Sequence, residues 1–461
     1  MRPRGVVLVA VLLVTALVTM LAASLMFCMR AEVGASTAKM RGEQAYDAAM
    51  SGLVRASVVV RQSVADPRIW YDNPDIFQNQ LVADDGANQW YFSVYGDDPS
   101  EQPTSVRFGV TDEASKINVN SAGPEVLTNL KNMTAELVDC LIDYRDADSD
   151  TRAEGAEQDY YDQLTVPYVV PNGPLATLEE LLLVKGFNGQ IVFGEDANMN
   201  GLLDPSEDDG DQSFPPDNRD GRLDKGLRGV ATAYSSEPNT DRSGRRRISL
   251  NGDPNLLKGA GLSDKTVEFI RLYRAEGNTF KHPSELLEMR YTLKQEHKES
   301  RNLKVGAAIE SEVGGEQLAT VLDRLTVLPP DSRKPVLGLV NVNTAPAEVL
   351  AALPGMDANL AQQIVDARRN LEPEVKSSIA WLFTQNLVEA AAFKTIAPYL
   401  TTRSYQFSLR CVGFGVPCGR YCVIDAVFDM TSGTPRIVYL RDVSRLGLPF
   451  ALDTSVTERS R

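Results

Sequence analysis

Histidine is almost missing from this sequence, which contains two in 461 residues. Neither His282 nor His297 stands near a cysteine or serine in a spacing typical of a catalytic triad or metal site, so we interpret both as solvated surface residues. Long basic stretches are missing as well, and the formal net charge is -15. Nucleic-acid-binding proteins usually carry a basic footprint, so this charge argues against a DNA or RNA partner and favours binding of divalent cations.

Cysteine is scarce too, with five in the chain. Cys28 lies in an apolar segment, and Cys140 sits in a helical pattern typical of a buried thiol. Cys411, Cys418 and Cys422 flank a turn of glycine and proline residues. A disulfide across that turn is compatible with an oxidising compartment, and the sequence leaves the choice of pair open.

A nucleophile paired with a base is not visible in the sequence, and the carboxylates are too numerous to single out two as a catalytic dyad. We therefore predict that the protein is not an enzyme; a calcium-dependent hydrolase is the enzymatic alternative. The length predicts two or three structural units, and 43% apolar with 24% charged residues is typical of a folded chain.

The N-terminal segment carries no charge from Val6 to Met29. As a helix these residues would span about 36 Å, which is enough to cross a hydrocarbon core of about 30 Å. Only MRPRG precedes them, and the apolar run is too long for a secretory signal peptide. Conventional cleavage near the small residues Ala22, Ala23 and Ser24 is the alternative interpretation.

The helical pattern continues beyond this segment to Ala65 and stops at Asp66-Pro67, because proline disfavours helix in the residue before it. A helix of this length, half apolar and half amphipathic, resembles the helix of type IV pilins and pseudopilins. The bond between Gly5 and Val6 resembles the site that prepilin peptidase cuts. Most such proteins have glutamate at the fifth mature position, which is Ala10 here, and the resemblance implies a subunit at the filament tip. A plain signal anchor is the competing interpretation.

Strand patterns occur at two places far apart in the chain. Gln89–Tyr95 and Ser105–Thr111 come early, and Ser404–Phe414, Tyr421–Met430 and Arg436–Val443 come near the end. Helical periodicity dominates between them. We predict an α+β fold in which the long N-terminal helix packs on a small antiparallel pilin-like sheet, with a large all-α domain inserted between its strands.

The predicted insertion contains an internal repeat. Ile117–Leu127 matches Val340–Leu350, and the offset of 223 residues holds without a gap to Arg145 and Arg368. A looser copy covers residues 248–274. Each copy predicts an extended segment, a helix, a tight turn and a second helix, with Ser121 and Thr344 as N-caps.

These copies, at 117–145, 248–274 and 340–368, resemble helix-hairpin-helix units. Such hairpins often bind DNA phosphates through the backbone of a Gly-x-Gly turn. Here Asp357 replaces the second glycine of the third copy, the first copy reads Lys131-Asn-Met133, and only Gly259-Ala-Gly261 keeps both glycines. We therefore favour helical scaffolding and expect no nucleic-acid partner.

The segment from Asp196 to Glu207 fits the twelve-residue EF-hand loop. Calcium needs six to eight oxygen ligands, and alternate residues of a tightly turned loop point inward. Gly201 permits the bend at position six. We predict a structural calcium site whose ligands are Asp196, Asn198, Asn200, the Leu202 carbonyl, Asp204 and Glu207.

A second, incomplete loop follows, in which Asn218, Asp220 and Asp224 are in register but Pro216 occupies position one. Ten acidic residues fall between Glu195 and Asp224, and without cations they would repel one another. A solvated acidic loop is the alternative for both segments.

The chain as a whole resembles the minor pseudopilin K family of the type II secretion system (general secretion pathway protein K). Besides Gly5, Ala10 and the split sheet, the resemblance is carried by Asp143–Tyr161, with Gly155-Ala-Glu157, and by Pro174–Gly186, with Leu178-Glu-Glu-Leu181. It implies a non-enzymatic subunit of the inner membrane with its large C-terminal region in the periplasm. The implied partners are pseudopilins I and J at the pseudopilus tip, prepilin peptidase and secreted substrates.

These interpretations divide the chain into a leader (1–5), an N-terminal helix (6–66), a first part of the sheet domain (67–116), an inserted domain (117–400) and closing strands with a tail (401–461). The calcium loop covers 196–207, or extends to 224 if the second loop also binds. A membrane-anchored helix-hairpin-helix DNA receptor of the competence type is the alternative function, against which the acidic charge and Asp357 argue.

Overall fold

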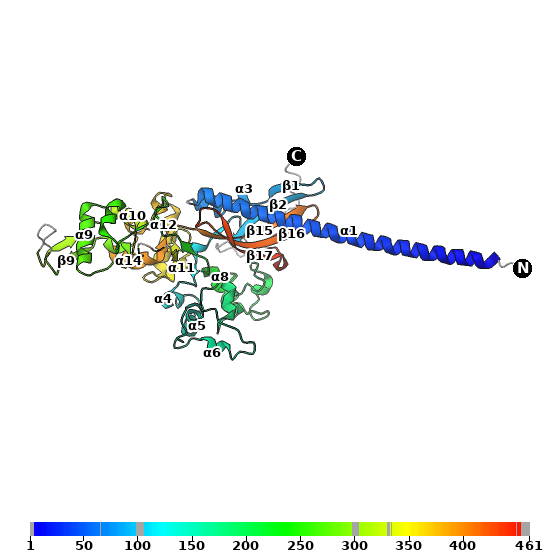
Figure 1. The fold of residues 1–461 in the computed structure, drawn as a ribbon, viewed down its shortest axis with the longest axis horizontal. Coiled ribbons are helices and arrows are strands. Elements are labelled where there is room, and N and C mark those ends of the chain that lie inside the picture. The colour runs from blue at the N-terminus through cyan, green and yellow to red at the C-terminus, as the bar shows by residue number, and fades with distance from the viewer. Residues whose placement is uncertain are drawn as a thin grey trace.

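The computed structural model describes residues 4–64, 66–97, 106–296, 304–329, 332, 334–448 and 450–452. Its longest element is helix α1 (Arg4–Ser63), which has no internal proline. Residues 7–36 of α1 are exposed throughout and project away from the rest of the molecule (Figure 1). Among the described residues this is a helix long and apolar enough to cross a membrane, by length and composition. Its end agrees with the prediction: Asp66 caps helix α2 (Pro67–Trp70) by accepting from the Arg68 N–H.

One antiparallel sheet combines strands from both ends of the chain. Its order is β1-β2-β15-β16-β17, while the short strands β3 and β4 pair with β2 and β15. The early strands are β1 (Gln80–Asp84), β2 (Gln89–Asp97), β3 (Val106–Arg107) and β4 (Thr111–Asp112), and the late ones are β15 (Gln406–Val416), β16 (Tyr421–Asp429) and β17 (Arg436–Asp442). Mixed helix and sheet, with a long apolar helix and an antiparallel sheet, is the fold class that we predicted.

Helix α1 packs on this sheet through small residues. Ala45, Ala49 and Ala56 are fully buried against β2, β15 and β16. A Cβ at Gly52 would lie 2.3 Å from Cys411 Sγ, and one at Gly413 would lie 2.1 Å from the Ala45 carbonyl oxygen. The backbones can approach this closely because neither glycine has a side chain.

Two strand predictions were wrong in detail. Residues 80–84 form the edge strand β1, which the sequence pattern did not indicate. The predicted strand Ser105–Thr111 is divided into β3 and β4, and Ser105 itself lies outside the described residues. The chain turns between them because Gly109 packs on the Trp70 and Tyr71 carbonyls, where a Cβ would be within 2.4 Å of both oxygens.

The segment between β4 and β15 is not all-α, so that prediction was wrong. Its helices are α4 (Pro124–Leu127), α5 (Ala135–Arg145), α6 (Gln158–Tyr161), α7 (Gly189–Phe193), α8 (Gly226–Val230), α9 (Asp264–Ala275), α10 (Gly315–Arg324), α11 (Ala347–Ala351), α12 (Ala358–Arg369), α13 (Trp381–Thr384) and α14 (Ala390–Ile396). It also holds the strands β5 (Ile117–Asn118), β6 (Ala231–Thr232), β7 (Ser236–Glu237), β8 (Ile248–Ser249), β9 (Arg290–Thr292), β10 (Ala308–Glu310), β11 (Leu325–Thr326), β12 (Val336–Leu337), β13 (Val340–Asn341) and β14 (Leu400–Thr401). These short strands pair two by two, which satisfies buried backbone groups that helices alone would leave unpaired.

Three units of this segment share one design, and we name them unit A (117–145), unit B (248–274) and unit C (340–368). The strand that opens each unit pairs in parallel with a later strand: β5 with β6, β8 with β11, and β13 with β14. The turn before the second helix contains a left-handed residue, which is Asn132, Gly261 or Gly355. Thr134, Ser263 and Asp357 then cap α5, α9 and α12.

Each unit is closed by an arginine near the end of its second helix. Arg145 donates to the Val119 and Ala122 carbonyls, and Arg368 donates to those of Val342 and Ala345, at equivalent positions. Arg274 donates to the Asn251 and Gly252 carbonyls in unit B. Units A and C share one core, whereas unit B has a core of its own at the far end of the molecule from α1 (Figure 1).

The predicted N-caps Ser121 and Thr344 were wrong. Helix α4 begins after Gly123, and α11 begins after Pro346. The Thr344 hydroxyl donates instead to Asp112 Oδ2, at 2.5 Å. A long-range partner thus holds the side chain that the local sequence offered as a cap.

Asp112 joins the two ends of the inserted segment. Its Oδ2 also accepts from Ser404 Oγ at 2.6 Å and from Asn341 Nδ2 at 3.0 Å. The carboxyl is buried, and burial raises its pKa to about 6, against the lowering effect of its hydrogen-bond donors.

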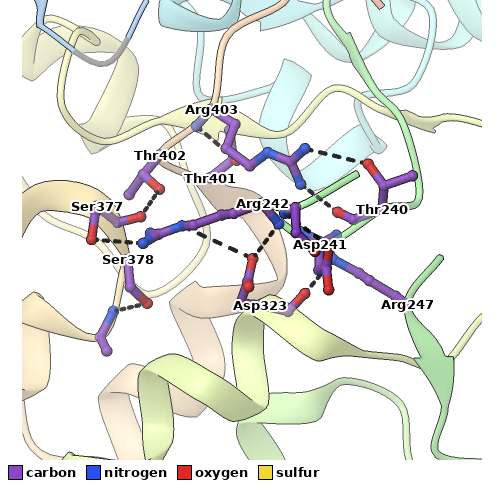
Figure 2. Close-up of polar contacts among 12 residues, drawn as sticks. Thr240, Asp241, Arg242, Arg247, Asp323, Ser377, Ser378, Thr401, Thr402 and Arg403 are labelled. Atoms are coloured by element: carbon purple, nitrogen blue, oxygen red, sulfur yellow. Dashed lines mark hydrogen bonds and ion pairs between the residues drawn. The ribbon is translucent and has the colours of Figure 1, made fainter. Parts of the chain in front are cut away.

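A second polar network links residues 237–247 to α10, to Ser377 beyond unit C and to the chain before β15 (Figure 2). Arg242 donates from its backbone to Asp323 and from its guanidinium to Ser377 Oγ, at 3.1 and 2.8 Å. Arg403 donates to the Thr240 carbonyl at 2.5 Å and to Glu237 at 3.0 Å. Residues 237–247 therefore bridge three parts of the inserted segment.

Two further expectations need correction. His282 is half-buried, its Nδ1 accepts from the Ser284 N–H, and burial lowers its pKa to about 4, whereas His297 lies outside the described residues. All five cysteines are free thiols. Cys411 and Cys422 lie on neighbouring strands but diagonally, since Cys411 faces Ile424, and diagonal neighbours are about 7 Å apart, which is too far for a disulfide.

Candidate metal centres

The predicted calcium loop follows α7 and ends in the short 3-10 helix Pro205–Glu207. Its first and last ligands are carboxylates that the fold takes out of water: Asp196 is 1% exposed and Glu207 is 2% exposed. Met199 and Gly201 both have left-handed backbones, with φ of 57° and 81°, which makes the tight bend that position six was predicted to need.

The side chains of the loop converge on one another. Asn198 Nδ2 and Asn200 Nδ2 both donate to Asp204 Oδ2, at 2.6 and 2.8 Å. Asp196 Oδ2 accepts from the Gly201 N–H at 3.1 Å. Glu207 bridges the ends of the loop, because its two oxygens accept from the Ala197 and Asp204 N–H groups. Asn198 and Asn200 are thus bonded to Asp204, whereas Asp196 and Glu207 accept from backbone N–H groups of the same loop.

The electrostatics of this ring suit a cation. Burial raises the pKa of Glu207, and the negative charge of Asp196 raises it further. A divalent cation between the Asp196 and Glu207 carboxylates would relieve this repulsion. Asn198 and Asn200 would then turn their side-chain oxygens, rather than their N–H groups, toward the cation. The residues present therefore fit calcium, which prefers oxygen donors.

The second predicted loop is less convergent. Asn218 Nδ2 donates to Asp220 Oδ2 at 3.1 Å, whereas Asp224 pairs with Lys131 at 2.5 Å. Lys131 comes from the turn of unit A, so Asp224 ties the loop to that unit. The processing residues Gly5 and Val6 lie within α1.

A group of carboxylates that we did not predict lies after α5. The carboxylate oxygens of Asp146, Asp148 and Glu157 all lie within 4.8 Å of one another. Asp146 directly follows α5, and Glu157 directly precedes α6, so the loop between these helices brings the three together. We name this group, with the adjacent Asp143, the carboxylate cluster.

The carboxylate cluster runs from two buried members, Asp143 and Glu157, through the half-buried Asp146 to the exposed Asp148, and several of its oxygens lack hydrogen-bond donors. Glu157 is 6% exposed and Asp143 is 0% exposed. Both Glu157 oxygens, Asp143 Oδ1 and Asp146 Oδ1 are buried and accept no hydrogen bond of ordinary geometry. Gly155 closes the cluster: a Cβ there would lie 1.9 Å from Asp143 Oδ2. Buried carboxylates in this state are the donor set of a hard cation.

The raised pKa values of the carboxylate cluster also favour a cation there. Burial raises the pKa of Glu157, and Asp143, Asp146 and Asp148 raise it further, while Asn172 offsets a part. Burial also raises the pKa values of Asp143 and Asp146. The Asp-x-Asp spacing at the end of a helix was visible in the sequence, but Glu157 is brought to it only by the fold.

Comparison with known proteins finds matches to one family. Two models of the family described as type II secretion system, protein K, match residues 119–193 and 340–402. Both stretches are therefore similar to protein K of the type II secretion system. The first match contains the carboxylate cluster and most of unit A, and the second contains unit C. The residues between them, 194–339, hold the calcium loop and unit B and are not covered by these family models.

A chain from the crystal structure of the GspK-GspI-GspJ complex of the enterotoxigenic Escherichia coli type 2 secretion system is also similar. It is 13% identical, with a TM-score of 0.36, and the match covers 88% of this chain and 98% of that chain. A likeness this distant carries no weight for the fold, so the similarity to protein K depends on the two family models. No curated protein matches the chain.

Proposed function

We propose that this protein is a minor pseudopilin in the tip complex of the pseudopilus, where it initiates pseudopilus assembly and supports export of folded proteins across the outer membrane. The observation that carries the proposal is the pair of protein K matches, which flank residues 194–339 on a scaffold of long helix and split sheet. The role is structural rather than enzymatic.

The N-terminal half of α1 is the proposed anchor. Residues 7–36 are exposed and the apolar run within them is long enough to span a bilayer once, which supports an inner-membrane helix with the remaining chain in the periplasm. Prepilin peptidase would cut between Gly5 and Val6. Because Ala10 carries no charge, a subunit with nothing above it would leave no unpaired carboxylate in lipid.

Other minor pseudopilins are the proposed partners. The similar crystal structure is a complex named for three such proteins, GspK, GspI and GspJ, and we expect pseudopilins of the I and J types to bind here. Secreted substrates are further candidate partners. We interpret units A, B and C as helix-hairpin-helix units that serve as scaffold, with no nucleic acid as partner.

Calcium is the proposed structural cation. Two sets of oxygen donors with buried members support it, namely the loop Asp196–Glu207 and the carboxylate cluster. A periplasmic domain meets calcium at concentrations that weak sites can use, and a single loop without flanking EF-hand helices suits a clamp better than a switch.

Co-purification tests the proposed function. When the full chain is expressed with the I and J pseudopilins of the same secretion system, we expect a detergent-stable complex and restored secretion in a strain lacking protein K. Gly5→Ala should leave the N-terminus uncut and secretion unrestored, whereas Gly34→Ala, at an open position of the same helix, should behave as wild type. Normal processing of Gly5→Ala, with cleavage near Ala23, would contradict the pseudopilin anchor.

A further inference from the structure

The calcium loop contacts the pilin-like sheet directly. The Met199 carbonyl accepts from Arg410 Nη2 of β15 at 2.5 Å and from Arg228 Nη1 of α8 at 3.5 Å. Met199 is the fourth residue of the loop and has a left-handed backbone, a conformation that persists in a residue with a side chain only where its surroundings hold it. The contact therefore joins residues 194–339, outside the family matches, to the sheet.

The two arginines share a carboxylate on the sheet. Arg410 faces Asp425 across the β15–β16 ladder, and its Nε lies 3.7 Å from Asp425 Oδ2. Arg228 Nη2 lies 3.6 Å from the same oxygen. Arg410 is 9% exposed, so its contacts with the Met199 carbonyl and Asp425 are largely screened from water.

Arg228 also contacts the loop's first ligand. Its Nη1 lies 3.9 Å from Asp196 Oδ2, so one guanidinium reaches two carboxylates, one on the loop and one on the sheet. A cation held by Asp196 would repel this guanidinium. A cavity of about 660 Å³, lined by Arg228, Arg410 and Asp425 among others, gives the Arg228 side chain room to move.

We propose that Arg228 and Arg410 make the calcium loop a cation-dependent latch between residues 194–339 and the sheet. Before calcium binds, Arg228 neutralises Asp196. When calcium binds, the cation takes the place of the Arg228 guanidinium beside Asp196, and Arg228 keeps only its contact with Asp425. Arg410 holds the Met199 carbonyl in both states, so that ordering of the loop by calcium is passed to β15 and β16. The proposal rests on the calcium binding proposed above.

Calorimetric titration of the full chain in detergent with CaCl₂ tests the role of Arg228. Arg228→Gln should tighten binding at the loop about five- to tenfold, because it removes a positive charge beside Asp196. Arg228→Lys should bind as wild type, and so should Lys258→Gln, which removes an exposed charge in unit B. Glu207→Gln should remove the loop's share of the heat and so identifies it. Equal affinity in Arg228→Gln and wild type would overturn the proposal.

Hydrogen exchange tests the role of Arg410. Calcium should slow exchange in residues 196–207 and in β15 and β16 of the wild type. In Arg410→Gln, calcium should slow exchange in residues 196–207 alone. If calcium also slows exchange in β15 and β16 of this variant, the latch is wrong. If the wild type gives no loop heat, the latch and the calcium site fail together, while the assignment as a tip pseudopilin, tested by co-purification, still stands.

Discussion

At the scale of single residues, the protein places carboxylates where water cannot reach them. Asp112, Asp143, Asp196 and Glu207 are each no more than 2% exposed. Asp112, which has several side-chain donors, joins distant parts of the fold, whereas both Glu157 oxygens in the carboxylate cluster lack donors. Buried carboxylate oxygens without donors are the candidate cation ligands of this cluster.

Gly155→Ala should destabilise the protein and weaken calcium binding at the carboxylate cluster. The new Cβ would lie 1.9 Å from Asp143 Oδ2, so that the backbone must shift, at a cost of about 1–3 kcal/mol. Chemical denaturation with and without calcium measures both effects. Gly189→Ala is the control, because a Cβ there meets nothing within 4 Å. Equal stability of the two variants would contradict the packing described here.

The stability of the protein should depend on pH through Asp112. When folded, this carboxyl keeps its proton up to about pH 6, whereas an unfolded aspartate releases it near 3.8. The folded state therefore binds more protons in this window, and the free energy of unfolding falls as pH rises from about 4 to about 6, by about 3 kcal/mol. Glu157 and Glu207, whose pKa values burial also raises, add changes of the same sign, whereas Asp241, whose pKa is lowered to about 2, opposes them.

Comparison with Asp112→Asn isolates the contribution of Asp112. Denaturant unfolding of both proteins should give a difference in free energy that changes through pH 4–6 and is constant above it. The other acids are common to both proteins, so their contributions cancel. A difference that stays constant from pH 4 to 6 would rule out a raised pKa at Asp112.

At the scale of elements, the three units show one solution repeated with different side chains. The left-handed turn residue is asparagine in unit A and glycine in units B and C, and the cap is threonine, serine or aspartate. Arginine alone is kept at the closing position. Its planar donors reach two carbonyls at once, which a lysine could not match in geometry. Burial lowers the pKa of Arg145 and of Arg368 to about 10.

Arg274→Ala should destabilise unit B without affecting units A and C. It leaves the Asn251 and Gly252 carbonyls without their donor, at a cost of about 2–4 kcal/mol, and unit B has its own core. Hydrogen exchange should rise in residues 248–327 alone. In Arg368→Ala it should rise in units A and C together, because they share a core. Lys258→Ala, at an exposed position of unit B, is the control.

At the scale of the whole molecule, a large inserted segment is tied to a small sheet at several separate places. Asp112 joins its start to its end, residues 237–247 contact α10 and Ser377, and the calcium loop contacts β15. These ties are polar, and they range from the buried Asp112 carboxyl to the exposed contact between Arg242 and Ser377. Because the calcium loop makes one of these ties, cations are expected to contribute to the stability of the whole chain.

Removal of calcium should lower the melting temperature of residues 31–461 by several degrees. A ligand at one hundred times its dissociation constant contributes about 2.7 kcal/mol per site. Glu157→Gln should raise the melting temperature in chelator, because it removes a crowded charge, and should reduce the gain from calcium. Asp159→Asn, at an exposed position of α6, should change neither the melting temperature in chelator nor the gain from calcium. An unchanged melting temperature of the wild type with chelator would disprove the calcium clamp.

Much of the fold could be predicted because its signals are local. The uncharged run of α1, its stop at Asp66-Pro67 and the strands β2, β15, β16 and β17 follow from composition and periodicity over short windows. The repeat was visible because Ile117–Leu127 matches Val340–Leu350 and the same offset holds to Arg145 and Arg368. The calcium loop could be proposed for the same reason, since its ligands come from twelve consecutive residues.

Only the tertiary structure decided the rest, because it depends on residues far apart in sequence. The local sequence predicts Thr344 as a helix cap, but its hydroxyl donates to Asp112, which is 232 residues away. Glu157 joins Asp146 and Asp148 because a loop folds back, and Arg410 meets Met199 because the sheet closes 211 residues later. The sequence by itself determined the long helix, the repeated units and the resemblance to protein K, whereas the burial of each carboxylate, and so its chemistry, was decided by three-dimensional packing.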